Sequence, residues 1–130
     1  MSVSGKPPYD PGNVFARILR GEIPCRKVYE DEWALAFHDI NPLAPVHVLV
    51  IPKGEYVSMV DFVADASAEE VAGFFRAVGW VAEDLGLMER GYRFLANHGP
   101  DAHQEVPHLH VHVFGGAPLG PMLKRTAASP

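Results

Sequence analysis

The most regular hydrophobic pattern in the chain lies between Ser67 and Gly86. Apolar side chains recur there at spacings of three and four residues, which places them on one stripe of an α-helix. The stripe consists of Val71, Phe74, Phe75, Val78, Ala82 and Leu85. Ser67 and Glu70 have the spacing of a capping box, and Gly86 suits the residue after the helix end. The pattern predicts one long helix whose phenylalanines pack in the core.

The flanking segments predict a second helix and several strands. Asn13 fits the N-cap position of a short helix over 14–20, with Gly21 as the residue after its end. Strands are predicted at 27–30, 33–38, 47–51, 92–97 and 106–114, the first two forming a hairpin and the third being stopped by Pro52. This order predicts the α+β class, an antiparallel sheet of about five strands with one long helix and a short N-terminal helix.

The chain is expected to form a single domain over 13–122. Residues 1–12 are rich in Pro, Gly and Ser and are expected to be a flexible leader, and residues 123–130 a C-terminal tail. No apolar run approaches the ~20 residues of a membrane span, so no membrane partner is expected. Cys25 is the only cysteine, so no intramolecular disulfide can form. A lone cysteine suits a reducing compartment, and the protein is therefore expected to be cytoplasmic.

The charge balance argues against nucleic acid as a partner. The formal net charge is −5, from 11 basic and 16 acidic residues, and no concentrated positive stripe is present in the sequence. A phosphate bound by this chain would have to be held by local donors such as backbone N–H groups, side-chain amides and imidazoles.

The histidines are concentrated in one segment. Five of the seven fall between His98 and His112, and three alternate with apolar residues as His108, His110 and His112. Side chains alternate between the faces of a strand, so the three imidazoles would share one face. Leu109, Val111 and Val113 would share the other and pack under the long helix.

Three interpretations of this segment compete. The histidines can be structural, without a chemical role. They can bind zinc, if His47 or His98 supplies a third ligand to a pair at i and i+2, although no cysteine pair supports such a site. They can also act as nucleophile and acid or base at phosphorus, which the sequence favours. A neutral imidazole is a good nucleophile near pH 7, and attack on phosphorus would split the reaction into two steps. One ring nitrogen must then keep its proton while the other stays free to attack.

The segment His108–Phe114 resembles the signature His-φ-His-φ-His-φ-φ, with φ apolar, of the histidine triad family of nucleotide hydrolases and transferases. The resemblance extends from about Val14 to Met122 and includes the stretches 15–24, 36–42, 44–47 and 84–87. The pattern is most similar to the branch of nucleoside phosphoramidases. The resemblance implies a purine nucleoside phosphoramidase-like hydrolase that releases a nucleoside monophosphate such as AMP, needs no cofactor or metal, and forms a homodimer.

The family's roles can be transferred by position. His110 would be the nucleophile, with its tautomer fixed by the carbonyl of His108, and His47 would orient the triad. His112 and Gln104 would contact the phosphate, and Asn97 would hold the nucleotide near it. Asp39 would bind the ribose hydroxyls, and a purine would be walled by Phe15, Ile23 and Phe37. From the sequence alone, Asp39 fits a turn-initiating carboxylate equally well, and Asn97 fits a loop cap.

Two departures from the family leave the leaving group open. Members of this branch carry a serine three residues before the first histidine, which assists the leaving amine, whereas this chain has Glu105. Its segment 119–130 also lacks the aromatic residues that such members can place near the partner's site. The alternatives are therefore a dinucleoside polyphosphate hydrolase of the same family and a nucleotide-binding scaffold with vestigial activity.

Overall fold

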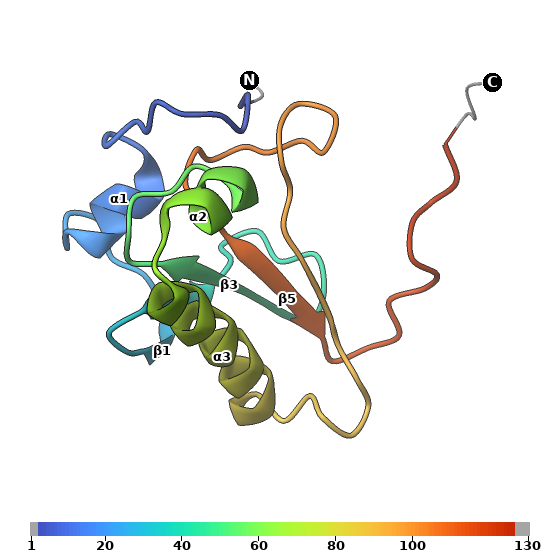
Figure 1. The fold of residues 1–130 in the computed structure, drawn as a ribbon. Coiled ribbons are helices and arrows are strands. Elements are labelled where there is room, and N and C mark those ends of the chain that lie inside the picture. The colour runs from blue at the N-terminus through green and yellow to red at the C-terminus, as the bar shows by residue number, and fades with distance from the viewer. Residues whose placement is uncertain (1–2, 127–130) are drawn as a thin grey trace.

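The computed structural model describes residues 3–126 and contains an antiparallel sheet of five strands in the order β1-β2-β3-β5-β4. The strands are β1 (Lys27–Glu30), β2 (Ala34–His38), β3 (Val46–Pro52), β4 (Arg93–Leu95) and β5 (Val111–Gly115). The helices are α1 (Val14–Leu19), α2 (Met59–Asp65) and α3 (Ala68–Asp84). Figure 1 shows α3 lying along one face of the sheet. Helices α1 and α2 lie toward the top of the view, away from the C-terminal end of α3. The predicted α+β class and the two predicted helices are confirmed.

The two faces of the sheet have different chemistry. The face under α3, here called the aliphatic face, consists of Ala34, Ala36, Val48, Val50, Val111 and Val113, packed with Phe74, Ala77, Val78 and Val81 of the helix. The opposite face, here called the histidine face, carries Leu35, Phe37, Leu49 and Ile51 together with the side chains of His47 and His112. Phe15 of α1 packs against this second face.

The helix ends follow the predicted caps. Asn13 Oδ1 accepts a hydrogen bond from Ala16 N at 2.9 Å, and Gly21 follows α1 with φ +79°. Ser67 and Glu70 form the reciprocal capping box of α3, and Gly86 follows that helix with φ +71°. Short-range signals of this kind are visible in sequence because both partners lie within four residues.

Helix α2 was not predicted. Asp61 accepts hydrogen bonds from the backbone N–H groups of Val57 and Ser58, both at 2.8 Å, and these bonds begin the helix. Ser58 and Asp61 have capping-box spacing, so the sequence contained a signal for this helix.

The strand predicted at 106–114 is wrong in length, because β5 begins only at Val111. Val50 pairs with Val111 in the antiparallel register. A longer β5 would therefore have to pair Leu109 with Pro52, the last residue of β3. Proline has no N–H to give to the ladder. The Pro52 carbonyl instead contacts the His108 ring, and Leu109 N donates to Tyr56 O at 2.8 Å. Strand β4 is also shorter than the predicted 92–97, and Pro52 is the last residue of β3 rather than the residue after it.

The predicted leader makes contacts with the domain. Residues 3–12 were expected to be flexible, but Val3, Gly5 and Tyr9 hydrogen-bond to the body of the protein. Residues 1–2 of the leader and 127–130 of the predicted tail lie outside the described residues. No helix within 3–126 is both long and apolar enough to cross a bilayer.

Candidate active site

The three histidines of the signature come from two kinds of backbone. His112 lies in β5, whereas His108 and His110 lie in the irregular segment before it. The alternation predicted from the sequence persists in the packing. Leu109, Val111 and Val113 join the core under α3, while the rings of His110 and His112 lie 5.0 Å apart on the other side.

His110 has one ring nitrogen held by the backbone. Its Nδ1 lies 2.7 Å from the carbonyl oxygen of His108, and a carbonyl can only accept, so Nδ1 must carry the proton. In the neutral ring, Nε2 then has a free electron pair. The ring is 6% exposed and packs edge-on against Phe15, with ring centres 5.0 Å apart. This is the contact expected from the family resemblance, and it produces the tautomer that a nucleophile needs.

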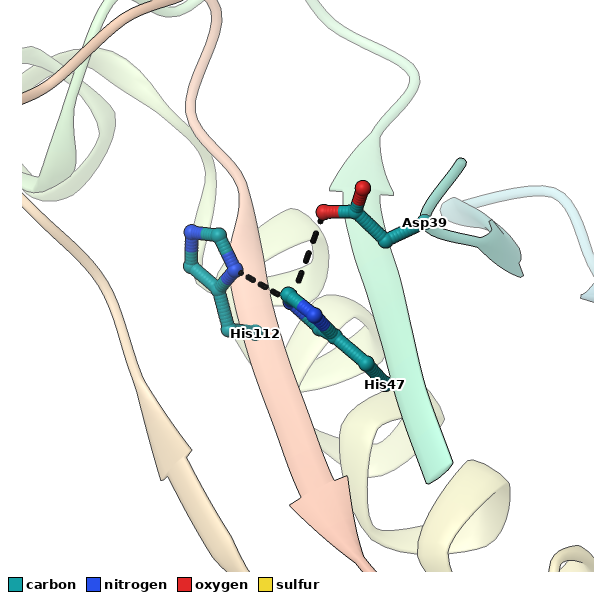
Figure 2. Close-up of side chains that lie close together, drawn as sticks. All are labelled: Asp39, His47 and His112. Atoms are coloured by element: carbon teal, nitrogen blue, oxygen red, sulfur yellow. Dashed lines mark hydrogen bonds and ion pairs between the residues drawn. The ribbon is translucent and has the colours of Figure 1, made fainter. Parts of the chain in front are cut away.

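His47, His112 and Asp39 form a chain of polar contacts (Figure 2). His47 Nε2 lies 2.9 Å from His112 Nδ1 and 3.4 Å from Asp39 Oδ2. On the other side of the His47 ring, Nδ1 accepts a hydrogen bond from Leu43 N at 3.0 Å. The neutral His47 ring therefore carries its proton on Nε2 and donates it toward His112 Nδ1. His112 is left with its own proton on Nε2, so that His110 offers an electron pair and His112 an N–H group.

Asp39, His47 and His112 also have the composition of a metal cluster, with ligand atoms within 4.8 Å of one another. A metal at His47 Nε2 would need that nitrogen unprotonated, with the ring proton on Nδ1. Leu43 N–H already donates to Nδ1, so the ring would have to lose both protons. As arranged here, the three side chains have the geometry of a hydrogen-bonded relay. His98, the other ligand considered, lies 3.0 Å from Ser58 Oγ instead.

The site lowers the basicity of its histidines. Burial lowers the pKa of His110, and the bond to the His108 carbonyl only partly opposes it. Burial lowers the pKa of His108 and of His112 to about 4, with a further contribution to His112 from His110 and His47. Burial also lowers the pKa of His47, against the attraction of Asp39. The rings are therefore neutral at pH 7, and the tautomers follow from their hydrogen bonds.

The predicted nucleotide-binding residues are only partly brought together. Phe15 and Phe37 contact each other edge-on, with ring centres 5.6 Å apart, in the cluster on the histidine face. Asp39 accepts a hydrogen bond from Asn41 N at 2.8 Å, which makes it a turn residue as well as a neighbour of His47. Ile23 and Asn97 are half-buried, and no contact recorded among residues 3–126 joins either to the histidines.

Gln104 does not point its amide at the histidines, contrary to the expectation of a phosphate contact. Its side chain is buried, where Oε1 accepts from Gly99 N at 3.0 Å and Nε2 donates to the carbonyls of Val57 and Val106. Both amide hydrogens are used, so Gln104 holds the loop in place. Its neighbour Glu105 is exposed and lies 3.2 Å from His103 Nε2.

Sequence reasoning missed Tyr9. Its hydroxyl lies 2.6 Å from His108 Nδ1, across 99 residues of sequence. The only signal available was an aromatic residue within a leader otherwise rich in Pro, Gly and Ser.

The fold and the site define an α+β protein with imidazoles gathered at one face of an antiparallel sheet. Residues 20–119 match the family model described as HIT domain, and the chain belongs to this family. An uncharacterized 13.2 kDa HIT-like protein of Azospirillum brasilense is 68% identical over 117 residues, which cover 90% of this chain and 96% of that protein.

Relatives with named activities are more distant in sequence. The purine nucleoside phosphoramidase of Escherichia coli K12 is 42% identical over 113 residues, covering 85% of this chain and 92% of that protein. A solved HIT family hydrolase from Clostridium thermocellum is 43% identical, with a TM-score of 0.79 over 87% of this chain and 97% of that one.

Proposed function

We propose that this chain is a hydrolase that cleaves purine nucleoside phosphoramidates through a nucleotidyl intermediate on His110. The observation that carries the proposal is the pair of tautomers. The His108 carbonyl holds the proton of His110 on Nδ1, while the relay through His47 leaves a proton on His112 Nε2. A free electron pair and an N–H donor thus come from adjacent rings, which is what attack at a phosphate and stabilisation of its oxygens require.

The proposed reaction has two displacements. His110 Nε2 bonds to phosphorus, the phosphorus–nitrogen bond to the amine breaks, and the amine takes a proton from solvent. Water then attacks the same phosphorus, and the bond from phosphorus to Nε2 breaks. The attacking water gives up a proton to solvent as the nucleoside monophosphate leaves. The His110 Nδ1–H bond to the His108 carbonyl persists through both steps. The relationship to the E. coli phosphoramidase supports this substrate class.

The substrate contacts proposed for the remaining residues follow the family pattern. Asp39 binds the ribose hydroxyls, Phe15, Ile23 and Phe37 wall the purine, and Asn97 holds the nucleotide. We further propose a cytoplasmic homodimer that needs no cofactor or nucleic acid. The lone Cys25 supports the compartment, and the edge strand β4, whose Phe94 is 53% exposed, supports an interface.

The test is release of AMP from an adenosine phosphoramidate. His110→Ala is expected to lose nearly all turnover, and mass spectrometry of the quenched wild-type protein should find one AMP on His110. His38→Ala is the control, because His38 shares the aliphatic side of β2 with Ala34 and Ala36. Retained turnover in His110→Ala would reject this residue as the nucleophile.

A second substrate class needs a direct comparison. Glu105 replaces the serine expected of phosphoramidases, which favours testing a dinucleoside polyphosphate side by side with the phosphoramidate. Faster cleavage of the polyphosphate would assign that activity instead. Tight AMP binding with background turnover on both would indicate a scaffold.

A further inference from the structure

The N-terminal segment, residues 3–12, makes three hydrogen bonds to the segments that surround the site. Val3 N donates to Gln104 O at 3.1 Å, Ser58 Oγ donates to Gly5 O at 2.6 Å, and the Tyr9 hydroxyl lies 2.6 Å from His108 Nδ1. The first contact holds the loop before the triad, the second the start of α2, and the third the triad itself. In Figure 1 this segment runs across the same end of the molecule as the loop that leads into β5.

The backbone at Gly5, next to the middle contact, favours glycine over any other residue. Gly5 has φ +79°, and a Cβ there would lie 2.8 Å from ring atoms of His98 and 3.0 Å from Gly99 N. A positive φ also disfavours side chains. Gly5 is itself buried. The segment is therefore fitted against the loop, as a part of the folded domain.

Two hydrogen bonds, to Pro52 and to Tyr9, fix the tautomer of His108. The His108 Nε2 lies 2.9 Å from the Pro52 carbonyl, so Nε2 carries the ring proton and Nδ1 is an acceptor. Burial raises the pKa of Tyr9 above its ordinary value, so its hydroxyl keeps its proton and donates to Nδ1. His108 is fully buried, and these two bonds satisfy both of its ring nitrogens.

His108 connects Tyr9 to the nucleophile. Its carbonyl is the group that holds His110 Nδ1 at 2.7 Å, and its ring is fixed between Pro52 and Tyr9. A ring that loses the Tyr9 bond leaves a buried acceptor unpaired, and relief of that cost requires the ring or the backbone around it to move. Phe15 lies against both His108 and His110, so such movement would reach the nucleophile directly.

We propose that Tyr9 is a positioning residue of this site: its hydroxyl fixes the ring of His108, and through the His108 carbonyl it sets the orientation of His110. The N-terminal segment 3–12 is thus a working part of the active site and not a leader. The inference rests on the proposed function for its kinetic test only, since the contact with His108 can be measured without turnover.

The experiment compares Tyr9→Phe with Tyr29→Phe. Both substitutions remove one hydroxyl and its hydrogen bond, but the Tyr29 hydroxyl donates to Asp31 at the far edge of the sheet. The phenyl ring of Tyr9→Phe keeps the edge contact with His108, so folding should persist. With an adenosine phosphoramidate, Tyr9→Phe should lower kcat about tenfold, equivalent to about 1.4 kcal/mol at the transition state, with KM within about twofold. Tyr29→Phe should match the wild type.

Imidazole ¹⁵N NMR gives the readout that is independent of activity. In the wild-type chain, His108 Nδ1 should resonate as a hydrogen-bonded acceptor, and in Tyr9→Phe it should shift toward the position of a free acceptor, with no such shift in Tyr29→Phe. An unchanged His108 signal together with unchanged kcat would overturn the inference. A changed signal with KM raised and kcat unchanged would also overturn it, because Tyr9 would then act in binding. If the wild-type chain itself releases no AMP, the proposed function fails while the NMR comparison still decides the Tyr9 contact.

Discussion

The two faces of the sheet are built from alternate residues of the same strands and are stabilised by different forces. On β5, Val111 and Val113 face α3, while His112 lies on the histidine face. The histidine face is hardly more exposed at most of its positions: His47 is 3% and Leu49 5% exposed. Apolar burial is non-directional, whereas buried imidazoles require a partner for each polar nitrogen.

The requirement for partners is met on the histidine face. Within residues 3–126, every side-chain nitrogen or oxygen that is fully shielded from solvent has a hydrogen-bond partner. In His110 and His112 the partnered nitrogen is Nδ1, and Nε2 is the one left for a substrate. Because each partner accepts or donates in a fixed sense, the network also fixes which ring nitrogens carry protons. The aliphatic face therefore contributes apolar burial, whereas the hydrogen bonds of the histidine face also fix the tautomers of its rings.

The largest expected effect comes from breaking the aliphatic face. Phe74 is fully buried among the strands and α2, and Phe74→Ala should lower the free energy of unfolding by about 3–5 kcal/mol through lost burial and a cavity. Phe75 is adjacent on the same helix but 37% exposed, so Phe75→Ala should cost clearly less. Urea unfolding of the two variants measures the difference. Equal losses would show that the face under α3 is not the main apolar core.

Acid should weaken the histidine face selectively. The pKa of His108 and of His112 is about 4 in the folded protein and near 6.5 in an unfolded chain. The unfolded state then binds more protons below pH 6.5. The free energy of unfolding should therefore be greatest above that pH and fall on acidification by about 1.4 kcal/mol per pH unit for each histidine.

The slope is best measured between pH 6.5 and 4.5. Glu30, whose pKa is lowered to about 2 by Lys27 and Lys53, begins to lose its contribution only below that range. His112→Asn should make the slope clearly shallower, since one of the four rings whose pKa is lowered by burial is gone. A free energy of unfolding that is flat across the window would contradict the buried, neutral state of these rings.

Substitution of Gln104 measures how much its three buried side-chain hydrogen bonds contribute to the free energy of unfolding. Gln104→Met removes the three side-chain bonds to Gly99, Val57 and Val106, and should cost about 1–3 kcal/mol of unfolding free energy because their buried backbone groups lose partners. Glu105→Gln, one residue on and exposed, should stay within about 0.5 kcal/mol. Denaturant curves of the pair decide the point. A neutral Gln104→Met would mean that the loop is held by other contacts.

The sequence predicted what local patterns determine. The alternation of His108, His110 and His112 with apolar residues and the capping box at Ser67 involve neighbours within a few positions, so the faces of β5 and the start of α3 could be predicted. The extent of β5 could not, because it depends on where β3 ends. Pro52 is 59 residues away from Val111 in the chain, and only the register brings the two strands together.

The hydrogen-bond partners of Gln104 and Tyr9 could not be predicted from the sequence for the same reason. Gln104 was expected at the phosphate because the family resemblance transfers residue positions, but its amide is used by Val57, 47 residues earlier. Tyr9 lies in a segment whose composition is typical of a flexible leader, and its partner His108 is 99 residues away. Hydrogen-bond partners at such separations have no periodicity that a pattern could reveal.

The smallest expected change in stability is that of Glu105→Ser. This substitution is expected to change the rate of phosphoramidate cleavage. Glu105→Ser restores the serine expected of phosphoramidases, and it should leave the free energy of unfolding within about 0.5 kcal/mol because the side chain is exposed. An ionised carboxylate only accepts hydrogen bonds, whereas a hydroxyl can also donate one to a leaving amine. Release of AMP from an adenosine phosphoramidate should therefore rise by at least about threefold.

Two controls separate the hydroxyl from the charge. Glu105→Ala removes the carboxylate without adding a donor, so it should not reproduce the rise. A dinucleoside polyphosphate has a phosphate leaving group that departs without needing a proton at neutral pH, so its cleavage should respond little to Glu105→Ser. An equal rise in Glu105→Ala would trace the effect to the lost negative charge beside the incoming phosphate. In that case Glu105 acts through repulsion, and the leaving group gains nothing from the serine.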